Sequence, residues 1–199
     1  MTGTLLHDGS ADHDGRRRVT RIELVRHAKA HSRDRWWGKP DRQRPLSEAG
    51  IDQARTLARH LCQGQPISAL YSSPFVRCTE TLQPLAQATG LPIVCEEALA
   101  EVTALPMLDD GDGWIASAWL GGRTVALVNE LVRKHDGERV VLCTHGDVVP
   151  ALMALLVGRD GLEIESVRLR KGGRFSLDFE GLRCVAATFS PAPTERTRG

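Results

Sequence analysis

The chain has 199 residues, of which 26 are Lys or Arg and 25 are Asp or Glu, so its formal net charge at pH 7 is +1. The length fits one domain with a sizeable core, and the balanced charge gives no whole-molecule argument for binding nucleic acid or a membrane surface. No apolar run approaches the roughly 20 residues needed to cross a bilayer.

The five cysteines are odd in number, widely spaced and form no Cys-x-x-Cys pair. This pattern favours reduced core residues of a cytoplasmic protein over a disulfide framework or a zinc site.

Residues 1–18 are polar, contain acidic side chains and lack apolar periodicity, which predicts a disordered tail and no secretory signal. His7 and His13 lie in this tail, but no matching partners for a metal site accompany them. Residues 191–199 form a second polar tail, so the predicted domain covers residues 19–190.

In residues 19–25, polar and apolar side chains first alternate and the last residues are apolar, with many β-branched side chains. This pattern predicts a strand that enters a core. The strand ends in Arg26-His27-Ala28-Lys29. Ligands of α/β proteins bind at the carboxyl ends of strands. A histidine beside an arginine there could hold or attack an anion, whereas the alternative is a solvated basic loop.

Residues 31–44 are predicted to form a loop, because Gly38 and Pro40 disfavour regular structure. Trp36 and Trp37 lie among five cations, Arg33, Arg35, Lys39, Arg42 and Arg44. Such a loop could clamp phosphates and stack a base, or its tryptophans could pack as anchors.

Ser47 is predicted to cap a helix that stops at Gly64. A short strand follows at residues 67–72. Ser73 then has the features of the next helix cap, with Pro74 at the first helical position.

Arg77 falls in the first turn of that second helix, beside unpaired backbone N–H groups. This arrangement suits an anion site, although an arginine that points into solvent is the alternative. The helix is predicted to stop at Gly90, and residues 91–95 are a third short strand.

Three carboxylates, Glu96, Glu97 and Glu101, precede a weakly patterned segment at residues 105–113. By themselves they do not identify a site. A helical turn is predicted at residues 114–120 and a separate helix at 123–135.

Residues 139–144 form a continuous apolar run of the length expected for a central parallel strand. His145-Gly146-Asp147 follows, and residues 148–157 resume helical spacing. This repeats the first arrangement of strand, histidine and helix start.

The last part of the domain is predicted to contain three short strands, at residues 166–169, 174–179 and 183–189. The basic turn Arg170-Lys171-Gly172-Gly173 connects the first two of them.

Four segments, in this order, resemble the histidine phosphatase superfamily, also called phosphoglycerate mutase-like. Residues 24–28 resemble its Arg-His-Gly signature, and residues 71–81 are similar to its Ser-Pro-x-x-Arg-x-x-x-Thr helix start. Residues 98–101 resemble the segment that carries the acid, and residues 144–146 resemble the second histidine motif.

Within the superfamily, the chain resembles the small SixA-type phosphatases, and even more the phosphatase domain of proteins fused to a Nudix domain. The basic loop up to residue 46 and the turn at residues 168–173 carry the second comparison. Ala28 departs from the family pattern, because glycine usually stands there, and this affects the expected substrate choice more than catalysis.

The resemblance implies a three-layer α/β/α sandwich with a mostly parallel sheet. It further implies that His27 attacks phosphorus and carries a phosphohistidine. Around the phosphate we expect Arg26, Arg77 and a protonated His145.

The same resemblance gives Glu101 the role of protonating the leaving oxygen and then activating water. Arg33 is an additional candidate for phosphate contact, and Lys29 and Lys171 are weaker ones. No metal or other cofactor is implied, because His27 and His31 lie at a strand-to-loop junction and have no matching carboxylate.

The leading functional hypothesis is a phosphatase for a small phosphorylated metabolite, with a nucleotide favoured by the tryptophan-bearing loop. The alternative is a SixA-like phosphatase for protein phosphohistidine, which would take a phosphoprotein as substrate. A mutase and a non-catalytic phosphate-binding module, such as the partner of a separate Nudix protein, are less favoured. Only the basic loop favours a nucleic acid partner.

Overall fold

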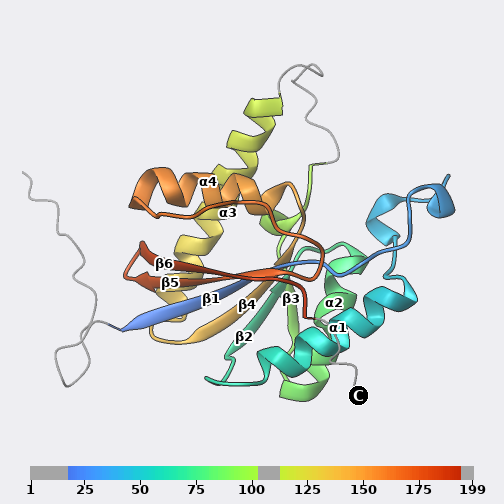
Figure 1. Ribbon diagram of the computed structural model, residues 1–199, viewed down its shortest axis with the longest axis horizontal. Helices are drawn as coiled ribbons and strands as arrows, with labels where there is room; N and C mark the ends of the chain where they lie inside the picture. Colours follow the sequence, from blue (N-terminus) through green and yellow to red (C-terminus); the bar gives the residue numbers. More distant parts are fainter. Residues whose placement is uncertain (1–17, 103–112, 194–199) are drawn as a thin grey trace, which may run out of the picture.

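The computed structural model describes residues 18–102 and 113–193 (Figure 1). The predicted tails therefore lie outside the described residues, apart from Arg18 and residues 191–193. Most of the weakly patterned segment at residues 105–113 also lies outside them.

In this part of the chain the strands form one six-stranded sheet. Its order is β3 (Ile93–Cys95), β2 (Ala69–Ser72), β4 (Arg139–Thr144), β1 (Val19–Arg26), β5 (Arg174–Glu180) and β6 (Arg183–Ser190). The first four strands are parallel, and β5 and β6 are each antiparallel to the preceding strand in this order. Every residue of β4 is buried, as its apolar run predicts for a central strand.

Two helices cover each face of the sheet. Helices α1 (Glu48–Leu61) and α2 (Val76–Thr89) lie on one face, and α3 (Gly113–Lys134) and α4 (Val148–Asp160) lie on the other (Figure 1). Alternate side chains of β1 enter the two cores, since Ile22 and Leu24 pack with α3 and α4 whereas Val25 packs with α1 and α2. The predicted three-layer α/β sandwich with a mostly parallel sheet is confirmed.

The predicted cap of α1 is present, because Ser47 Oγ accepts a hydrogen bond from Gly50 N at 3.3 Å. The predicted start of α2 is wrong. This helix begins at Val76 with Phe75 as its N-cap, so Pro74 precedes it. Ser73 Oγ lies 2.7 Å from His145 Nε2, and this contact takes the place of the predicted capping role.

The predicted break before residue 123 is also wrong, because α3 continues through Gly121 and Gly122. A Cβ atom on Gly121 would lie 2.7 Å from the carbonyl oxygen of Ala151 in α4. The glycine thus permits close packing of two helices rather than ending one of them.

Residues 166–169 do not form the predicted strand. Leu169 is buried in the core on the α3 and α4 side, and its carbonyl oxygen accepts a hydrogen bond from Arg26 Nη1 at 2.6 Å. The backbone carbonyl of Leu169 is therefore hydrogen-bonded to a side chain rather than to a neighbouring strand.

All five cysteines are free thiols, but they are not all core residues as predicted, because Cys62 and Cys95 are exposed. In the described ranges no helix is both long and apolar enough to span a bilayer.

Candidate active site

Three parallel strands end side by side at one edge of the sheet. Arg26, the last residue of β1, pairs with Thr144, the last residue of β4, and β2 ends beside Cys143. The two histidines that follow β1 and β4 are therefore neighbours, and their ring centroids are 5.4 Å apart.

His27 presents an unprotonated ring nitrogen. Its Nδ1 lies 2.7 Å from the carbonyl oxygen of Ala28, which can only accept, so Nδ1 carries the proton and Nε2 keeps its lone pair. Burial, and then the nearby charges of His145, Arg77 and Arg26, lower the pKa of His27 to about 3. His27 is thus neutral at physiological pH.

His145 is fully buried and has the opposite charge state. Burial opposes its protonation, but hydrogen bonds and charge interactions with Cys78 and Glu101 raise its pKa to about 9. In the protonated ring Nε2 donates to Ser73 Oγ, and Nδ1 faces Glu101 Oε2 at 3.3 Å. His145 is therefore a cation next to a neutral His27.

Arg77 is fully buried at the start of α2 and is held by two carboxylates. Its Nη2 donates to Glu101 Oε1, and its Nη1 donates to the carbonyl oxygen of Asp41 at 2.9 Å and lies 3.1 Å from Asp41 Oδ2. Burial favours the neutral form of Glu101, but His145 and Arg77 outweigh it and hold the pKa of Glu101 well below its usual range. Glu101 is thus a carboxylate in this structure.

Arg26 completes the group of cations. Burial lowers the pKa of its guanidinium, and its Nε is buried without a hydrogen-bond partner. A Cβ atom on Gly146 would lie 2.4 Å from Arg26 Cζ, so a larger residue there would displace this guanidinium from its present position.

The structure accommodates the methyl group of Ala28, which departs from the family pattern. Ala28 is fully buried and packs with Leu46 and Ala54. Its backbone N–H donates to Thr81 Oγ1 of α2 at 3.0 Å, and no described residue other than glycine has a positive φ. The position therefore does not require glycine here.

Part of this group lines a cavity of about 540 Å³, whereas Arg77 and His145 are fully buried and are not among the residues that line it. Arg26, His27 and Glu101 line it, and Arg33, Arg44 and Lys171 add positive charge. Lys29, the other weaker candidate for phosphate contact, does not line this cavity. The side chain of Arg33 is 78% exposed, which places it at the rim, with its Nε 4.0 Å from Asp41 Oδ1.

Neither tryptophan of the 31–44 loop is among the residues that line this cavity. Trp36 Nε1 donates to the carbonyl oxygen of Pro40 at 3.0 Å, and Lys39 Nζ lies 4.5 Å from its ring centroid. Trp36 thus fits the packing alternative, whereas Trp37 is 87% exposed.

A second cavity, of about 380 Å³, adjoins the first, because Glu101 and Val102 line both. Phe75 and Trp119 contribute aromatic rings to it, and the guanidinium of Arg123 lies 4.3 Å from the centroid of the Trp119 ring. Charged groups of both signs complete the lining, namely Asp41, Arg42 and Glu97.

The sequence had not singled out two residues of the site. Asp41 approaches Arg77 only because the loop folds back over α2, and Ser73 carries a local pattern that is typical of a helix cap. No spacing in the sequence predicts either contact.

The arrangement is suited to phosphoryl transfer. A neutral imidazole nitrogen lies among three cations that can bind phosphate oxygens, and a carboxylate is close enough to exchange protons. In the described ranges no group of three or more His, Cys, Asp or Glu side chains lies together as a candidate metal site.

Comparison with known proteins gives a match to the family model "Histidine phosphatase superfamily (branch 1)" over residues 22–107 and 118–190. An 8-oxo-(d)GTP phosphatase from Mycolicibacterium smegmatis is 30% identical over 175 residues, which are 88% of this chain. The match covers 49% of that relative, so the chain spans about half of its length.

Solved structures show the same fold. The YhfR protein of Bacillus stearothermophilus has a TM-score of 0.66 and 19% identity, over 83% of this chain and 94% of its own. The protein histidine phosphatase SixA, solved with tungstate, has a TM-score of 0.55 and 24% identity, over 85% of this chain and 94% of its own.

Proposed function

The chain belongs to branch 1 of the histidine phosphatase superfamily, and we propose that it is a phosphatase that acts on a small phosphorylated metabolite through a phosphohistidine on His27. The observation that carries the proposal is the pairing of a neutral His27, with its Nε2 free, and a cationic His145. A nucleophile needs its lone pair, whereas a phosphate ligand needs positive charge.

In the first step, His27 Nε2 bonds to phosphorus while the bond to the leaving oxygen breaks. Arg26, Arg77 and His145 stabilise the phosphoryl oxygens, and losing one such donor typically costs on the order of 2.7–4 kcal/mol of transition-state stabilisation. In the second step, water attacks phosphorus and the electron pair of the P–N bond returns to Nε2.

Glu101 exchanges protons in both steps. It begins as a carboxylate that Arg77 and His145 hold ionised. A bound phosphate competes for these two cations, so the carboxyl becomes easier to protonate, and a substrate that arrives as the monoanion supplies the proton. Glu101 then gives this proton to the leaving oxygen and takes one from the attacking water.

We favour a nucleotide as the substrate. The cations of the 540 Å³ cavity suit phosphate groups, whereas the adjoining 380 Å³ cavity offers the rings of Phe75 and Trp119 and the carboxylates of Asp41 and Glu97. A flat base with N–H donors matches this second set. The name of the Mycolicibacterium smegmatis relative, which describes a phosphatase of a nucleotide, supports the same choice.

Protein phosphohistidine is the second candidate, and the ionised state of Glu101 favours it. A phosphohistidine has a better leaving group than an alkyl phosphate, so it depends less on protonation by a carboxyl group.

The test is a substrate panel of p-nitrophenyl phosphate, nucleoside di- and triphosphates, sugar phosphates and a phosphohistidine peptide. We expect turnover that disappears in His27→Ala, with a nucleotide preferred. A preference for the peptide would select the second candidate. Tight phosphate binding without any turnover would contradict the proposal and indicate a binding module.

A further inference from the structure

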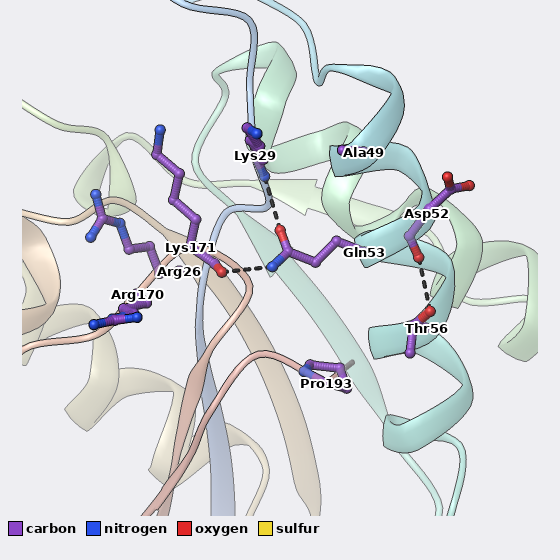
Figure 2. Close-up of a pocket in the computed structure, with 9 residues that line it drawn as sticks. All are labelled: Arg26, Lys29, Ala49, Asp52, Gln53, Thr56, Arg170, Lys171 and Pro193. Atoms are coloured by element: carbon purple, nitrogen blue, oxygen red, sulfur yellow. Dashed lines mark hydrogen bonds between the residues drawn. The ribbon is translucent and has the colours of Figure 1, made fainter. Parts of the chain in front are cut away.

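A third cavity, an open hollow of about 710 Å³, also lies next to the catalytic cavity (Figure 2). Lys29, Gln53 and Arg170 are among the residues that line it, and Arg26 and Lys171 line both this hollow and the catalytic cavity. We call it the basic hollow. In Figure 2, Arg26, Arg170 and Lys171 lie on one side of it, and Asp52 and Thr56 of α1 lie on the other.

The cations of the basic hollow form no direct ion pairs with described carboxylates, although the charges of Asp147 and Glu101 act on Arg26 from the catalytic side. No ion pair between a described carboxylate and any of Arg26, Lys29, Arg170 or Lys171 is present. Asp52 also lines the hollow, but it pairs with Arg55 at 3.2 Å. The hollow therefore has a positive charge that an anion would offset.

Two further features agree with an excess of positive charge. Burial, and then the charges of Arg26, Arg44, Lys29 and Arg77, lower the pKa of Lys171. The Nε of Arg26 is buried without a hydrogen-bond partner.

The backbone around the hollow is held in place by Gln53. Its Oε1 accepts from Lys29 N at 3.0 Å and its Nε2 donates to the carbonyl oxygen of Lys171 at 2.8 Å, as Figure 2 shows. Gly172 has φ +77°, and a Cβ atom there would lie 2.4 Å from Gln53 Cδ. Its N–H donates to the carbonyl oxygens of Arg26 and His27 at 3.0 and 3.2 Å. The basic turn is thus fixed against both α1 and the end of β1.

From these observations we propose that the basic hollow is a second phosphate-binding site, next to the catalytic one. Lys29, Arg170 and Lys171 hold the phosphate group, and the shared residues Arg26 and Lys171 connect the two sites. The group is either a distal phosphate of the substrate or a separate phosphate ion. The inference rests on the proposed function only for the first of these two sources.

The first test is a titration with inorganic phosphate, followed by NMR at the side-chain amide of Gln53 and at the ring of His27. We expect two distinct binding curves in the wild-type protein. In the Lys29→Gln/Arg170→Gln double variant the Gln53 curve should move to about tenfold higher phosphate, as expected when two partly exposed cationic contacts are lost, whereas the His27 curve stays.

The matched control is Arg133→Gln/Arg183→Gln. It removes the same net charge, but Arg133 lies near the end of α3, just before β4, and Arg183 begins β6, so both are at the sheet edge opposite the site. The control should leave both curves unchanged. Two results would overturn the proposal. One is a Gln53 binding curve that coincides with the His27 curve, and the other is a Gln53 binding curve that stays at the same phosphate concentration in the double variant.

Kinetics then distinguish the two sources. If the hollow holds a distal phosphate, the double variant should lose about tenfold in kcat/KM for a nucleoside triphosphate, with p-nitrophenyl phosphate unaffected. If the hollow holds a separate ion, the double variant should have the wild-type kcat/KM for both substrates, while its Gln53 binding curve still moves to higher phosphate. Turnover of p-nitrophenyl phosphate tests the proposed function independently of both results.

Discussion

At the scale of single residues, the two histidines differ in charge because their surroundings differ. His27 is buried among cations and donates to a backbone carbonyl, whereas His145 faces the carboxylate of Glu101 and the hydroxyl of Ser73. The pKa values of the two rings are therefore pushed apart, to about 3 and about 9. Opposite shifts in neighbouring groups let two residues of the same type take different roles, here a neutral nucleophile and a cationic phosphate ligand.

These shifts predict a broad pH plateau in kcat/KM when the rate is expressed per substrate monoanion, so that it reports the free enzyme. Activity should fall as pH rises through about 9, because His145 loses its proton, and on the acid side only as pH approaches about 3, because His27 gains one. The measurement is a pH–rate profile of wild type and His145→Gln. The variant should be slow and lack the alkaline limb, so an unchanged limb would contradict the assignment.

The same shift of His145 affects stability. Its pKa in the folded protein, about 9, exceeds the ordinary value of 6.5. Its contribution to the free energy of unfolding is therefore fully present below about pH 6.5 and is lost as pH rises through about 9. Urea unfolding across this range should show a larger loss for wild type than for His145→Gln.

Glu101→Gln tests proton transfer. An amide cannot protonate the leaving oxygen, so turnover of an alkyl phosphate should fall by about 10²–10⁴-fold. The fall should be smaller for p-nitrophenyl phosphate, whose leaving group needs less protonation. The two substrates are compared in the same preparation, and equal losses on both would assign Glu101 to binding rather than to proton transfer.

Sequence pattern identified the chemistry-bearing residues that directly follow strands or begin helices. His27, His145 and Arg77 are of this kind. They lie close together because the parallel strands before them end at the same edge of the sheet. Asp41 and Ser73 could not be identified in this way, because their contacts depend on how a loop and a pre-helix turn fold in three dimensions.

At the scale of elements, the strands were predictable wherever an apolar run ends in a turn, as in β4. The failures come from packing that the pattern does not encode. Gly121-Gly122 has the local appearance of a helix stop, yet α3 continues because Gly121 packs on α4.

These two adjacent glycines give an internally controlled prediction. In Gly121→Ala the added methyl would lie 2.7 Å from the carbonyl oxygen of Ala151, and such overpacking typically costs about 1–3 kcal/mol in the free energy of unfolding. Gly122 is exposed, and a methyl group added there would have no neighbouring atom within 4 Å, so Gly122→Ala should stabilise by about 0.5–1 kcal/mol. Urea unfolding of both variants checks the difference in sign, and destabilisation of similar size in both would contradict this account of α3.

At the scale of the whole molecule, one buried carboxylate joins the parallel and antiparallel parts of the sheet. Glu23 of β1 accepts from Arg139 of β4 at 2.7 and 2.9 Å, and from Arg174 and Ser176 of β5 at 3.2 and 2.6 Å. Its side chain is 3% exposed. This contact pattern was not predictable, because a charged residue in an alternating strand is equally consistent with a solvated face.

Replacing Glu23 should destabilise the whole fold. Glu23→Ala leaves the buried guanidinium of Arg139 without its carboxylate, and breaking a buried pair in this way costs about 3–5 kcal/mol. The control is Asp178→Ala, which removes another carboxylate–arginine pair between β1 and β5, with Arg21 at 2.7 Å. That pair is partly exposed, so its loss should cost less than about 1 kcal/mol. Both values come from urea unfolding. Equal costs would mean that these two neighbouring positions of the β1–β5 pairing contribute alike and that Glu23 has no special role in joining the three strands.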